Sequence, residues 1–417
     1  MAQIAIVERK CTGCGLCQSN CPFGAIADKS QIMQVITAMK RSEEVIACVA
    51  PAFVGQFGKD ATPAKIKAAM RILGFTDVVE VAIGADLCKK FRENDLVVNA
   101  VAAHQERFYG LSLDPDTQII ISTGATEAIA ATLLALTGPG DEVLTFEPFY
   151  DSYGAIIGLS GATHTTAPLR APDFQPDLAT LENSFSERTR VVLVNNPHNP
   201  TGAVFPAETL QRIVELAAKY NAVIVTDEVY EHLTFGPAHI PVATLPGAAE
   251  RTLTISSAGK TFSFTGWKIG WLSGPAELVA AVRAVKSFLS YSSGTPFQGA
   301  IALGLGMEDA FFTGIAQTLQ AKRDVLSEGL RAAGLTVFEP QGTYFVNADV
   351  APLGITDATA LARRLPELVG VGAIPVAVFC HEEGAQRTRT LLRFAFCKKT
   401  EVLQEAAERI AKLGQVL

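Results

Sequence analysis

Residues 119–136 read IIISTGATEAIAATLLAL, an apolar run followed by a small-residue turn and a second, longer apolar run. The β-branched residues at the start favour a strand at Ile119–Ser122, and the length of the second run favours a helix at Thr126–Thr137. Gly124 supplies the turn between them. A buried strand that leads directly into a helix is typical of α/β proteins with a parallel sheet.

The alternation of strand and helix continues on the C-terminal side of this stretch. Further strand-like runs, each bounded by turn residues or helices, lie at Glu142–Phe146, Arg190–Asn195, Ala222–Thr226 and Thr252–Ser256. The pattern predicts an α/β fold whose large domain has a mostly parallel sheet covered by helices on both faces.

The last part of the chain has a different pattern. A long helical region runs from Pro275 to Ala332, with a break near Gly294. Beyond it we expect strands at Thr336–Pro340, Thr343–Asn347 and Leu391–Phe396, and helices at Ala358–Val369 and Glu401–Leu413. This mixture predicts a smaller α+β domain. The predicted domains are therefore an N-terminal segment at 1–92, a large domain at 93–300 and a small domain at 301–417.

Composition excludes several functional classes. The chain has 417 residues, of which 48% are hydrophobic and 18% charged, so it is neither a disordered chain nor a coiled coil. Its net charge is -7 and no basic tract interrupts that balance, which argues against nucleic acid as a partner. Apolar stretches such as Ile129–Leu136 are shorter than the ~20 residues of a membrane helix, and Met1–Lys10 holds no apolar signal core. We expect a soluble, cytoplasmic, multidomain protein with no membrane partner.

The cysteines are unevenly distributed. Of the eight, four lie between Cys11 and Cys21, and the others are Cys48, Cys88, Cys380 and Cys397. In a reducing cytoplasm such a dense run indicates a metal or cluster site rather than a disulfide framework. We interpret Cys380 and Cys397 as ordinary buried cysteines.

Four polar segments follow predicted strands, at the sheet edge where open parallel sheets bind ligands. They are Ser122–Thr126, Asn195–Gly202, Thr226–Tyr230 and the lysine-bearing loop Ser256–Gly270. The first suits a phosphate, because peptide N–H groups and the helix dipole favour anions, and the third places a carboxylate at a strand end, where a cationic partner is expected. Taken singly, each segment has a simpler explanation, such as an ordinary strand–helix turn, a loop built from Asn and Pro, or solvated lysines.

Together, the four segments resemble the class I/II aminotransferases, which are fold-type-I pyridoxal-phosphate enzymes. The resemblance extends from about Leu96 to the C-terminus. Within the family, Tyr150–Tyr153, Asn196–Gly202 and Trp267–Trp271 are similar to the branch of kynurenine, methionine and N-succinyldiaminopimelate aminotransferases. The resemblance implies a fold-type-I architecture with a large, mostly parallel domain and a small α+β domain.

The resemblance also implies roles for individual residues. Lys260 stands where the family forms a Schiff base with the cofactor, and Asp227 where it faces the pyridine nitrogen. Tyr230 and Asn199 match the residues that hydrogen-bond the phenolic oxygen of the cofactor. Asn195 matches a polar contact near the cofactor, and Tyr150 matches a ring stacked on the pyridine. Arg393 matches the arginine that binds the substrate's α-carboxylate. The phosphate cup is matched by Gly124, Ala125, Thr126, Ser257 and Lys268.

The implied activity is transamination with pyridoxal 5'-phosphate as the cofactor. An amino group moves from an amino acid to a 2-oxo acid through the Lys260 Schiff base, and the freed lysine amine moves a proton on the substrate. Family members are homodimers with active sites at the interface, so a homodimer is expected here. The motif residues handle the cofactor and the common carboxylate and do not decide which amino donor and acceptor are used.

The N-terminal run Cys11-x2-Cys14-x2-Cys17-x3-Cys21-Pro22 resembles that of bacterial ferredoxins. Thiolates at this spacing bind a 4Fe-4S cluster, and a zinc site is the milder alternative. In two-cluster ferredoxins the fourth cysteine of the run ligates the other cluster, whereas this chain has a single run. The expected ligands are Cys11, Cys14 and Cys17 with Cys21, or with Cys48 or Cys88 in its place.

The segment from Val45 to about Cys88 looks like the start of an iron-only hydrogenase domain, but the later cysteine motifs of such a domain are missing. Hydrogenase activity is therefore not predicted. The expected elements are helices at Ser30–Lys40 and Thr62–Leu73 and strands at Val45–Ala50 and Val78–Ile83. In aminotransferases this place is taken by an N-terminal arm and by a tyrosine that reaches the partner subunit's cofactor phosphate.

Two other interpretations compete with an aminotransferase. The chain could be an iron–sulfur electron-transfer or redox-sensing protein with an inactive aminotransferase-like domain, and it would then have an electron donor or acceptor as a partner. Alternatively it is a poorly folded hybrid with neither activity. The sequence is compatible both with a natural fusion and with an artificial junction near residues 88–96.

Overall fold

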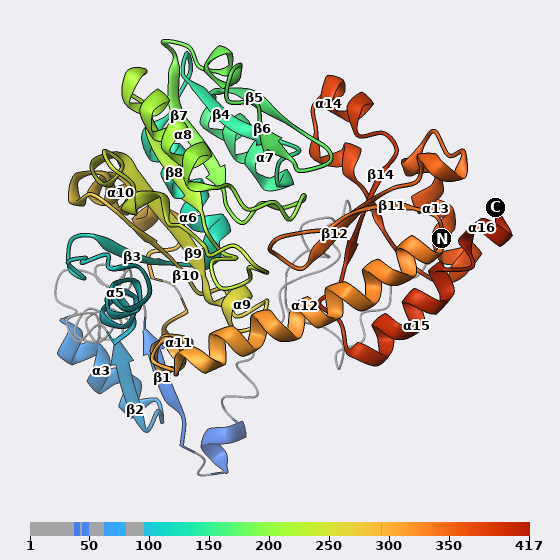
Figure 1. The fold of residues 1–417 in the computed structure, drawn as a ribbon. Helices are drawn as coiled ribbons and strands as arrows, with labels where there is room; N and C mark the ends of the chain where they lie inside the picture. Colours follow the sequence, from blue (N-terminus) through green and yellow to red (C-terminus); the bar gives the residue numbers. More distant parts are fainter. Residues whose placement is uncertain (1–36, 42–43, 50–61, 81–95, 293) are drawn as a thin grey trace, which may run out of the picture. The chain divides into compact units, whose positions relative to one another are not determined.

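The computed structural model of the chain describes residues 37–41, 44–49, 62–80, 96–292 and 294–417. Contacts along the chain divide it into two compact units, Met1–Asn94 and Asp95–Leu417 (Figure 1). The first contains the cysteine run, and the second contains all the segments that resemble an aminotransferase.

In the N-terminal unit, the described elements form a parallel β–α–β arrangement. Strand β1 (Ile46–Val49) pairs in parallel with β2 (Asp77–Glu80), and helix α3 (Pro63–Ile72) lies between them in sequence. The side-chain oxygen of Thr62 caps α3 by accepting from the peptide N–H of Lys65 at 3.4 Å. The strands and the helix expected at these positions are confirmed as far as the described residues extend.

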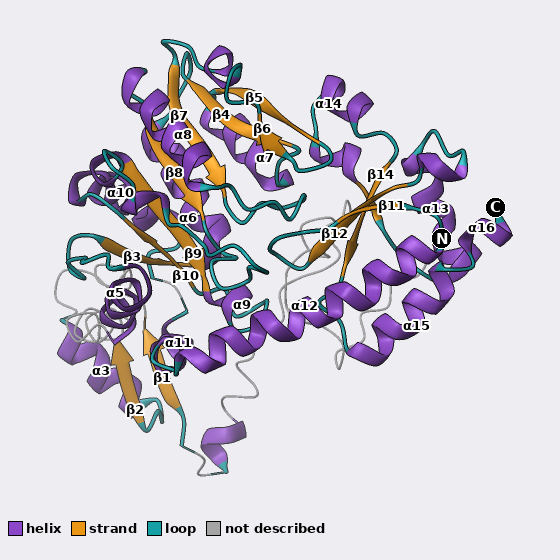
Figure 2. Ribbon diagram, in the orientation of Figure 1, coloured by secondary structure: helices purple, strands orange, loops and turns teal. Residues whose placement is uncertain are grey.

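A mixed sheet of eight strands forms the centre of the second unit (Figure 2). Its order is β3 (Ile119–Ser122), β10 (Gly270–Ser273), β9 (Thr252–Ser257), β8 (Val223–Asp227), β7 (Thr189–Asn195), β4 (Glu142–Glu147), β5 (Thr163–Arg170) and β6 (Gln175–Pro176). The five strands from β9 to β5 are parallel, while β10 runs antiparallel to both its neighbours. The mostly parallel sheet predicted from the sequence is confirmed.

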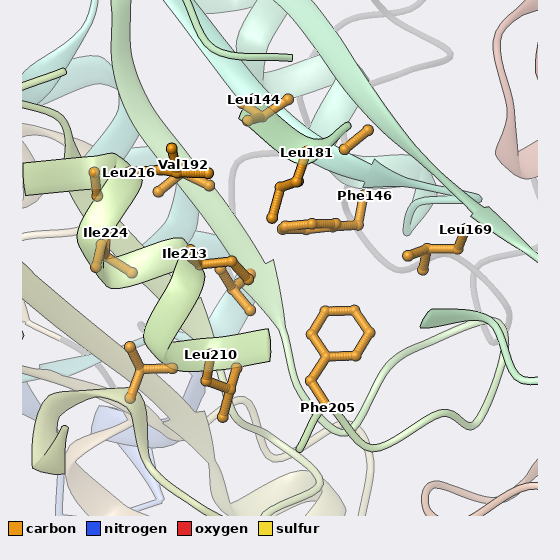
Figure 3. Packing of buried hydrophobic residues seen from close by; sticks show 14 of the residues in the cluster. Leu144, Phe146, Leu169, Leu181, Val192, Phe205, Leu210, Ile213, Leu216 and Ile224 are labelled. Carbon is orange, nitrogen blue, oxygen red and sulfur yellow. The ribbon is translucent and has the colours of Figure 1, made fainter. Parts of the chain in front are cut away.

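Helices pack on both faces of this sheet. Val192 and Val194 of β7 belong to a buried cluster with helix α8 (Ala207–Lys219), whose Leu210, Ile213 and Leu216 are visible in Figure 3. Alternate residues of β7 face the other side, where α6 (Gly124–Leu136), α7 (Asp151–Ser160) and α10 (Ala276–Leu289) form a second cluster. Burying each such Val or Leu side chain contributes about 1.5–3 kcal/mol, so the sheet edge that carries the polar segments stands on a rigid core.

A third cluster packs helix α5 (Leu96–Tyr109) on the end of the sheet. Val97 and Val101 of α5 lie against Trp271 of β10 and Ile301 of α11 (Thr295–Leu305), and all four side chains are almost completely buried. The expected helical region from Pro275 to Ala332 is thus three helices, α10, α11 and α12 (Asp309–Ala332), with breaks on both sides of α11.

The C-terminal part forms a four-stranded antiparallel sheet in the order β11 (Thr336–Phe338), β12 (Phe345–Asp349), β14 (Leu391–Ala395) and β13 (Ile374–Pro375). Its helices are α12, α13 (Ala358–Val369), α14 (Glu382–Arg387), α15 (Thr400–Ile410) and α16 (Leu413–Val416). Helices α12 and α15 meet so closely at Gly329 that a Cβ there would lie 2.5 Å from Ala407. The α+β character predicted for this part is confirmed.

Within the described ranges, no single helix has the length and apolar character needed to cross a membrane; the bent pair Phe297–Leu305 and Asp309–Ala332 meets those two criteria only when taken together.

Candidate active site

A pocket of about 350 Å³ lies at the carboxyl ends of β7, β8 and β9, beside the first turn of α6. Its lining includes all twelve residues that the sequence predicts for cofactor and substrate binding: Gly124, Ala125, Thr126, Tyr150, Asn195, Asn199, Asp227, Tyr230, Ser257, Lys260, Lys268 and Arg393. They come from segments that are distant in the sequence, so the structure brings the predicted set together in one place.

One end of the pocket is suited to an anion. Helix α6 begins at Gly124, whose φ of 75° places it in the left-handed region. A Cβ on Gly270 would lie 2.6 Å from the carbonyl carbon of Gly124, so both glycines are needed for the loop and the strand to approach each other. The first peptide N–H groups of α6, the helix dipole and the ammonium of Lys268 give this end a positive potential.

Asp227 lies at the end of β8 and is 4% exposed. The Tyr153 hydroxyl donates to its Oδ2 at 2.6 Å and the peptide N–H of Val229 to its Oδ1 at 3.4 Å. Burial raises the pKa of Asp227 to about 6, although these hydrogen bonds oppose the shift. Among the residues that the structure describes, no basic side chain forms an ion pair with this carboxylate.

The cationic partner expected for Asp227 is therefore not a described protein side chain. The pocket has three features that a ligand must match: this carboxylate, an anion cradle at α6 and the amine of Lys260. A protonated pyridine ring that carries a phosphate and an aldehyde satisfies all three, so the residues present fit pyridoxal 5'-phosphate.

Lys260 follows β9 on the short helix α9 (Ala258–Thr261), and its Nζ donates to the hydroxyl of Tyr344 at 2.6 Å. The ring of Tyr344 stands edge-on to that of Tyr230, with 5.4 Å between centroids. Thr343, which precedes it, is fully buried and has a φ of 68°, an unusual value for a β-branched residue. The local backbone is thus held in a strained form that directs Tyr344 toward the lysine.

Tyr344 was not among the residues predicted from the sequence. It lies at the start of a strand-like segment, where an aromatic residue is common for packing reasons alone. No local spacing connects it to Lys260, because the contact is made by the packing of the small α+β part against the large sheet.

Arg393 of β14 is fixed by contacts on three sides. Its guanidinium lies 4.1 Å from the ring centre of Phe345 and 4.4 Å from that of Phe379, which belongs to the 3-10 helix η7 (Val376–Phe379). Its Nη1 donates to Oδ1 of Asn199 at 2.8 Å. The two rings hold the guanidinium in position and leave its remaining N–H groups for a carboxylate in the pocket.

A chain of hydrogen bonds connects Arg393 to the strand that carries Asp227. The peptide N–H of Asn199 donates to Oδ1 of Asn195 at 2.6 Å, and Nδ2 of Asn195 donates to the backbone carbonyl of Asp227 at 2.8 Å. Asn195 and Asn199 are therefore ordered by the protein itself, as is required of side chains that must place a ligand.

Glu147, at the end of β4, attaches the C-terminal part to the large sheet. It is 3% exposed, and it accepts from Arg387 Nη2 and from the peptide N–H of His381, both at 2.7 Å. The peptide N–H of Phe149 also donates to the carbonyl of Phe379 at 2.7 Å. These bonds hold the wall of the pocket formed by Ile374, Val378 and Phe379.

The predicted cluster ligands Cys11, Cys14, Cys17 and Cys21, and also Cys88, lie outside the described residues, and the side chain of Cys48 is not described either. Of the other two cysteines, Cys380 is half-buried and Cys397 is exposed. The prediction that Cys397 is buried is wrong, because β14 ends at Ala395 and Cys397 lies beyond it, outside the sheet.

Comparisons with known proteins bear on both parts of the chain. Residues 54–410 match the family Aminotransferase class I and II, and residues 4–27 match a 4Fe-4S binding domain. A probable N-succinyldiaminopimelate aminotransferase from Mycobacterium tuberculosis is 48% identical over 326 residues, which cover 76% of this chain and 82% of that protein. The methionine aminotransferase of Escherichia coli is 36% identical over 334 residues, covering 80% of this chain and 86% of its own length.

A solved structure gives the same result for the fold. The N-succinyldiaminopimelate aminotransferase from Mycobacterium tuberculosis superposes with a TM-score of 0.74 at 49% identity, and the match covers 76% of this chain and 83% of that one. The resemblance predicted from the motifs after the strands, the fold class and the ferredoxin-type motif are thereby confirmed. The family match starts at residue 54, before the expected boundary at Leu96.

Proposed function

The chain belongs to the class I and II aminotransferases and is a pyridoxal-phosphate-dependent transaminase, and on this premise we propose how its own residues carry out the reaction. When bound, pyridoxal 5'-phosphate supplies an aldehyde that takes up the amino group and a ring that draws electrons from the substrate's α-carbon. The observation that carries the assignment is that all twelve predicted residues, Lys260 among them, line one pocket.

The residues divide the cofactor between them. Its phosphate is assigned to the anion cradle formed by Gly124, Ala125, Thr126, Ser257 and Lys268, and its pyridine nitrogen to Asp227. With a pKa of about 6, Asp227 is ionised at neutral pH, so that it holds a proton on that nitrogen. Tyr230 and Asn199 bind the phenolic oxygen, Asn195 orders Asn199, and Tyr150 stacks on the ring.

Lys260 Nζ is the group that takes the proton from the α-carbon and returns it. The hydroxyl of Tyr344, 2.6 Å away, orients the amine and keeps it hydrogen-bonded while it is free. Tyr344 acts through the lysine and is therefore a positioning residue.

Arg393 binds the α-carboxylate that every amino acid and 2-oxo acid carries, through the N–H groups that Asn199 does not use. The substrate side chain then lies against Ile374, Val378 and Phe379, which favours an apolar segment next to the α-carbon. Two relatives are named for N-succinyldiaminopimelate and for methionine, and both of these amino acids have such an apolar segment.

The test uses anaerobically purified protein whose absorption spectrum is recorded before and after pyridoxal 5'-phosphate and then an amino acid are added. The expected result is a visible band of lysine-bound cofactor that shifts with the amino acid and is missing in Lys260→Ala. Exchange of the α-proton in heavy water, followed by NMR over a panel of amino acids, identifies the donors. A protein that binds the cofactor without either response would contradict the assigned roles.

We propose that the protein is a homodimer. Large apolar side chains are exposed between residues 267 and 303, and the tilted rings of Trp267 and Phe297 lie 4.5 Å apart between centroids. Phe288 is 93% exposed and Tyr291 71%. Exposed apolar side chains of this size are typical of an interface between copies. Light scattering is expected to give twice the chain mass for the parent protein. The double variant Phe288→Glu, Tyr291→Glu is expected to have the mass of the monomer. A double variant that keeps the dimer mass would exclude this surface as the interface.

We also propose that Cys11, Cys14, Cys17 and Cys21 bind one 4Fe-4S cluster. The protein is then cytoplasmic, and the cluster exchanges electrons with an external donor or acceptor. The spacing of the cysteines and the match over residues 4–27 support this. Iron and sulfide analysis with Cys14→Ser as the control tests the cluster. A second candidate function, electron transfer with an inactive aminotransferase domain, is favoured if the cluster is reducible and the cofactor does not react with amino acids.

A further inference from the structure

A second group of buried polar side chains lies on the other side of the segment that carries Asp227 and Tyr230. It consists of His104 from α5 and of Glu231 and His232, which follow β8, and we call it the His–Glu–His cluster. One ligand atom from each residue lies within 4.8 Å of those of the other two. His104 is 2% and Glu231 4% exposed, and His232 is half-buried.

The hydrogen bonds of His104 leave one of its nitrogens directed into the cluster. Nδ1 lies 3.3 Å from the carbonyl of Leu305, which can only accept, so Nδ1 carries the proton. Nε2 then carries no proton, and its lone pair faces Nε2 of His232, which is 2.8 Å away. A ring that donates through one nitrogen to a carbonyl and presents the other is the usual form of a metal-binding histidine.

Glu231 is held in the same manner. Its Oε1 accepts from the Ser256 hydroxyl at 2.6 Å and its Oε2 from Nε2 of Gln105 at 3.4 Å, and the Tyr109 hydroxyl also bonds to it. In the described part of the chain, no lysine or arginine forms an ion pair with this buried carboxylate. A buried negative charge without a cation is costly, so the cluster has an electrostatic need for one.

Aromatic rings flank the cluster on the side of His232. The ring of His232 lies 4.5 Å from that of Phe312 and 4.8 Å from that of Phe108, measured between centroids. Aromatic rings on this side limit the access of water and so strengthen binding of an ion by the carboxylate.

We propose that the His–Glu–His cluster binds one divalent transition-metal ion. Two imidazole nitrogens and one carboxylate oxygen are a common zinc donor set, which leaves a fourth position open, and zinc is therefore the ion we assign. The ion joins helix α5 to the segment 227–232 and so supports Asp227 and Tyr230 from behind. It takes no part in the transamination.

The parent protein of this test carries Ser in place of Cys11, Cys14, Cys17 and Cys21, so that thiolates there do not compete for the metal. It is compared with a variant that also carries His104→Gln. Cofactor-loaded protein without an affinity tag is treated with a chelator and titrated with cobalt(II), whose visible bands report nitrogen and oxygen ligands, and then with zinc. The expected result is one equivalent bound, displaced by zinc, and a weakening of at least about 100-fold in His104→Gln. Zinc is also expected to raise the melting temperature of the parent protein and not that of the variant.

A matched control is His164→Gln, because Nδ1 of His164 forms a similar pair with Nε2 of His381 at 3.1 Å. It is expected to keep one equivalent of metal. Glu231→Gln provides a second variant of nearly unchanged shape, in case His104→Gln does not fold. A parent protein that binds no more cobalt than His104→Gln or Glu231→Gln would overturn the proposal, and would leave the cluster as a hydrogen-bonded one in which His232 donates to His104.

Discussion

The segment from Asp227 to His232 separates two buried sites that differ in how their charges are satisfied. On one side, Asp227 and Tyr230 line the pocket to which the cofactor is assigned. On the other, Glu231 and His232 face His104 within the protein, among aromatic rings. Each side holds a carboxylate that forms no ion pair with a lysine or arginine among the described residues. Asp227 is assigned to the pyridinium of the cofactor, and Glu231 to the proposed metal ion. A short segment after a parallel strand can thus support chemistry on one face and stability on the other.

The largest effect is expected from removing the lysine on the cofactor side. Lys260→Ala lacks the amine that moves the proton, so turnover should fall by at least about 10⁴-fold, while the pocket still binds the cofactor without a covalent bond. Single-turnover kinetics with the donor amino acid measures the fall, and exposed Lys219→Ala serves as the control. A residual rate within tenfold of the parent would remove Lys260 from the mechanism.

A smaller loss is expected from Arg393→Gln, which leaves the substrate carboxylate without its charged partner. A charge-assisted bidentate pair of this kind is worth about 3–5 kcal/mol, so kcat/KM should fall by roughly 10²–10⁴-fold with unchanged cofactor loading. Arg393→Lys keeps the charge without the planar fork, and should recover only part of the loss. If both variants keep the parent kcat/KM, the carboxylate is bound elsewhere.

Tyr344→Phe tests whether the lysine is positioned from the small sheet. Lys260 becomes an ammonium as it takes the proton, and losing a hydrogen bond to such a charged group costs about 1.5–3 kcal/mol, which predicts a kcat lower by roughly 10–100-fold with little change in KM. Slower proton transfer should also increase the kinetic isotope effect of an α-deuterated donor, whereas a purely structural defect would not. Tyr220→Phe, a change outside the pocket, is the control, and an unchanged isotope effect would argue against the positioning role.

The smallest effect concerns stability and has a definite sign. Because burial raises the pKa of Asp227 from 3.8 to about 6, the folded protein binds this proton more tightly than the unfolded chain. The favourable contribution is complete below pH 4 and is lost as the pH rises through 6, so without cofactor the free energy of unfolding should fall over this range, by up to about 3 kcal/mol.

Asp227→Asn removes this dependence and should make the cofactor-free protein more stable than the parent at pH 7, although it abolishes the acidic partner of the pyridine. Urea unfolding at several pH values measures both effects. A parent protein whose stability does not fall between pH 4 and 6 would show that the carboxyl group is not desolvated as described.

The cofactor side was predictable from the sequence because its residues follow strands in fixed order. Asn199, Asp227 and Lys260 each come a few positions after an apolar run, and the geometry of a parallel sheet brings such positions to one edge. Tyr344 and His104 could not be found in this way. Their partners lie 84 and 128 residues away, at Lys260 and His232, and the contacts depend on how a helix or a second sheet packs.

The same distinction applies to the strands. The apolar runs that became β4, β7 and β8 were recognised, whereas β5 and β10 were not among the expected strands. β5 reads THTTAPLR and carries a proline and few apolar residues, and β10 reads GWLS, with two apolar residues between a glycine and a serine. Both are strands because neighbouring strands pair with them, and pairing over long sequence distances leaves no local pattern.

The wall residues Ile374 and Val378 lie at and just after β13, a strand of two residues at the edge of the small sheet. An edge strand pairs with one neighbour only, so this segment can be lengthened, shortened or exchanged at little cost to the rest of the sheet. The residues assigned to the cofactor all lie on other segments. Natural selection can therefore alter the range of amines accepted by changing one short stretch of coding sequence while the chemistry is preserved, and randomising these two positions is the direct route to engineered transaminases with new substrates.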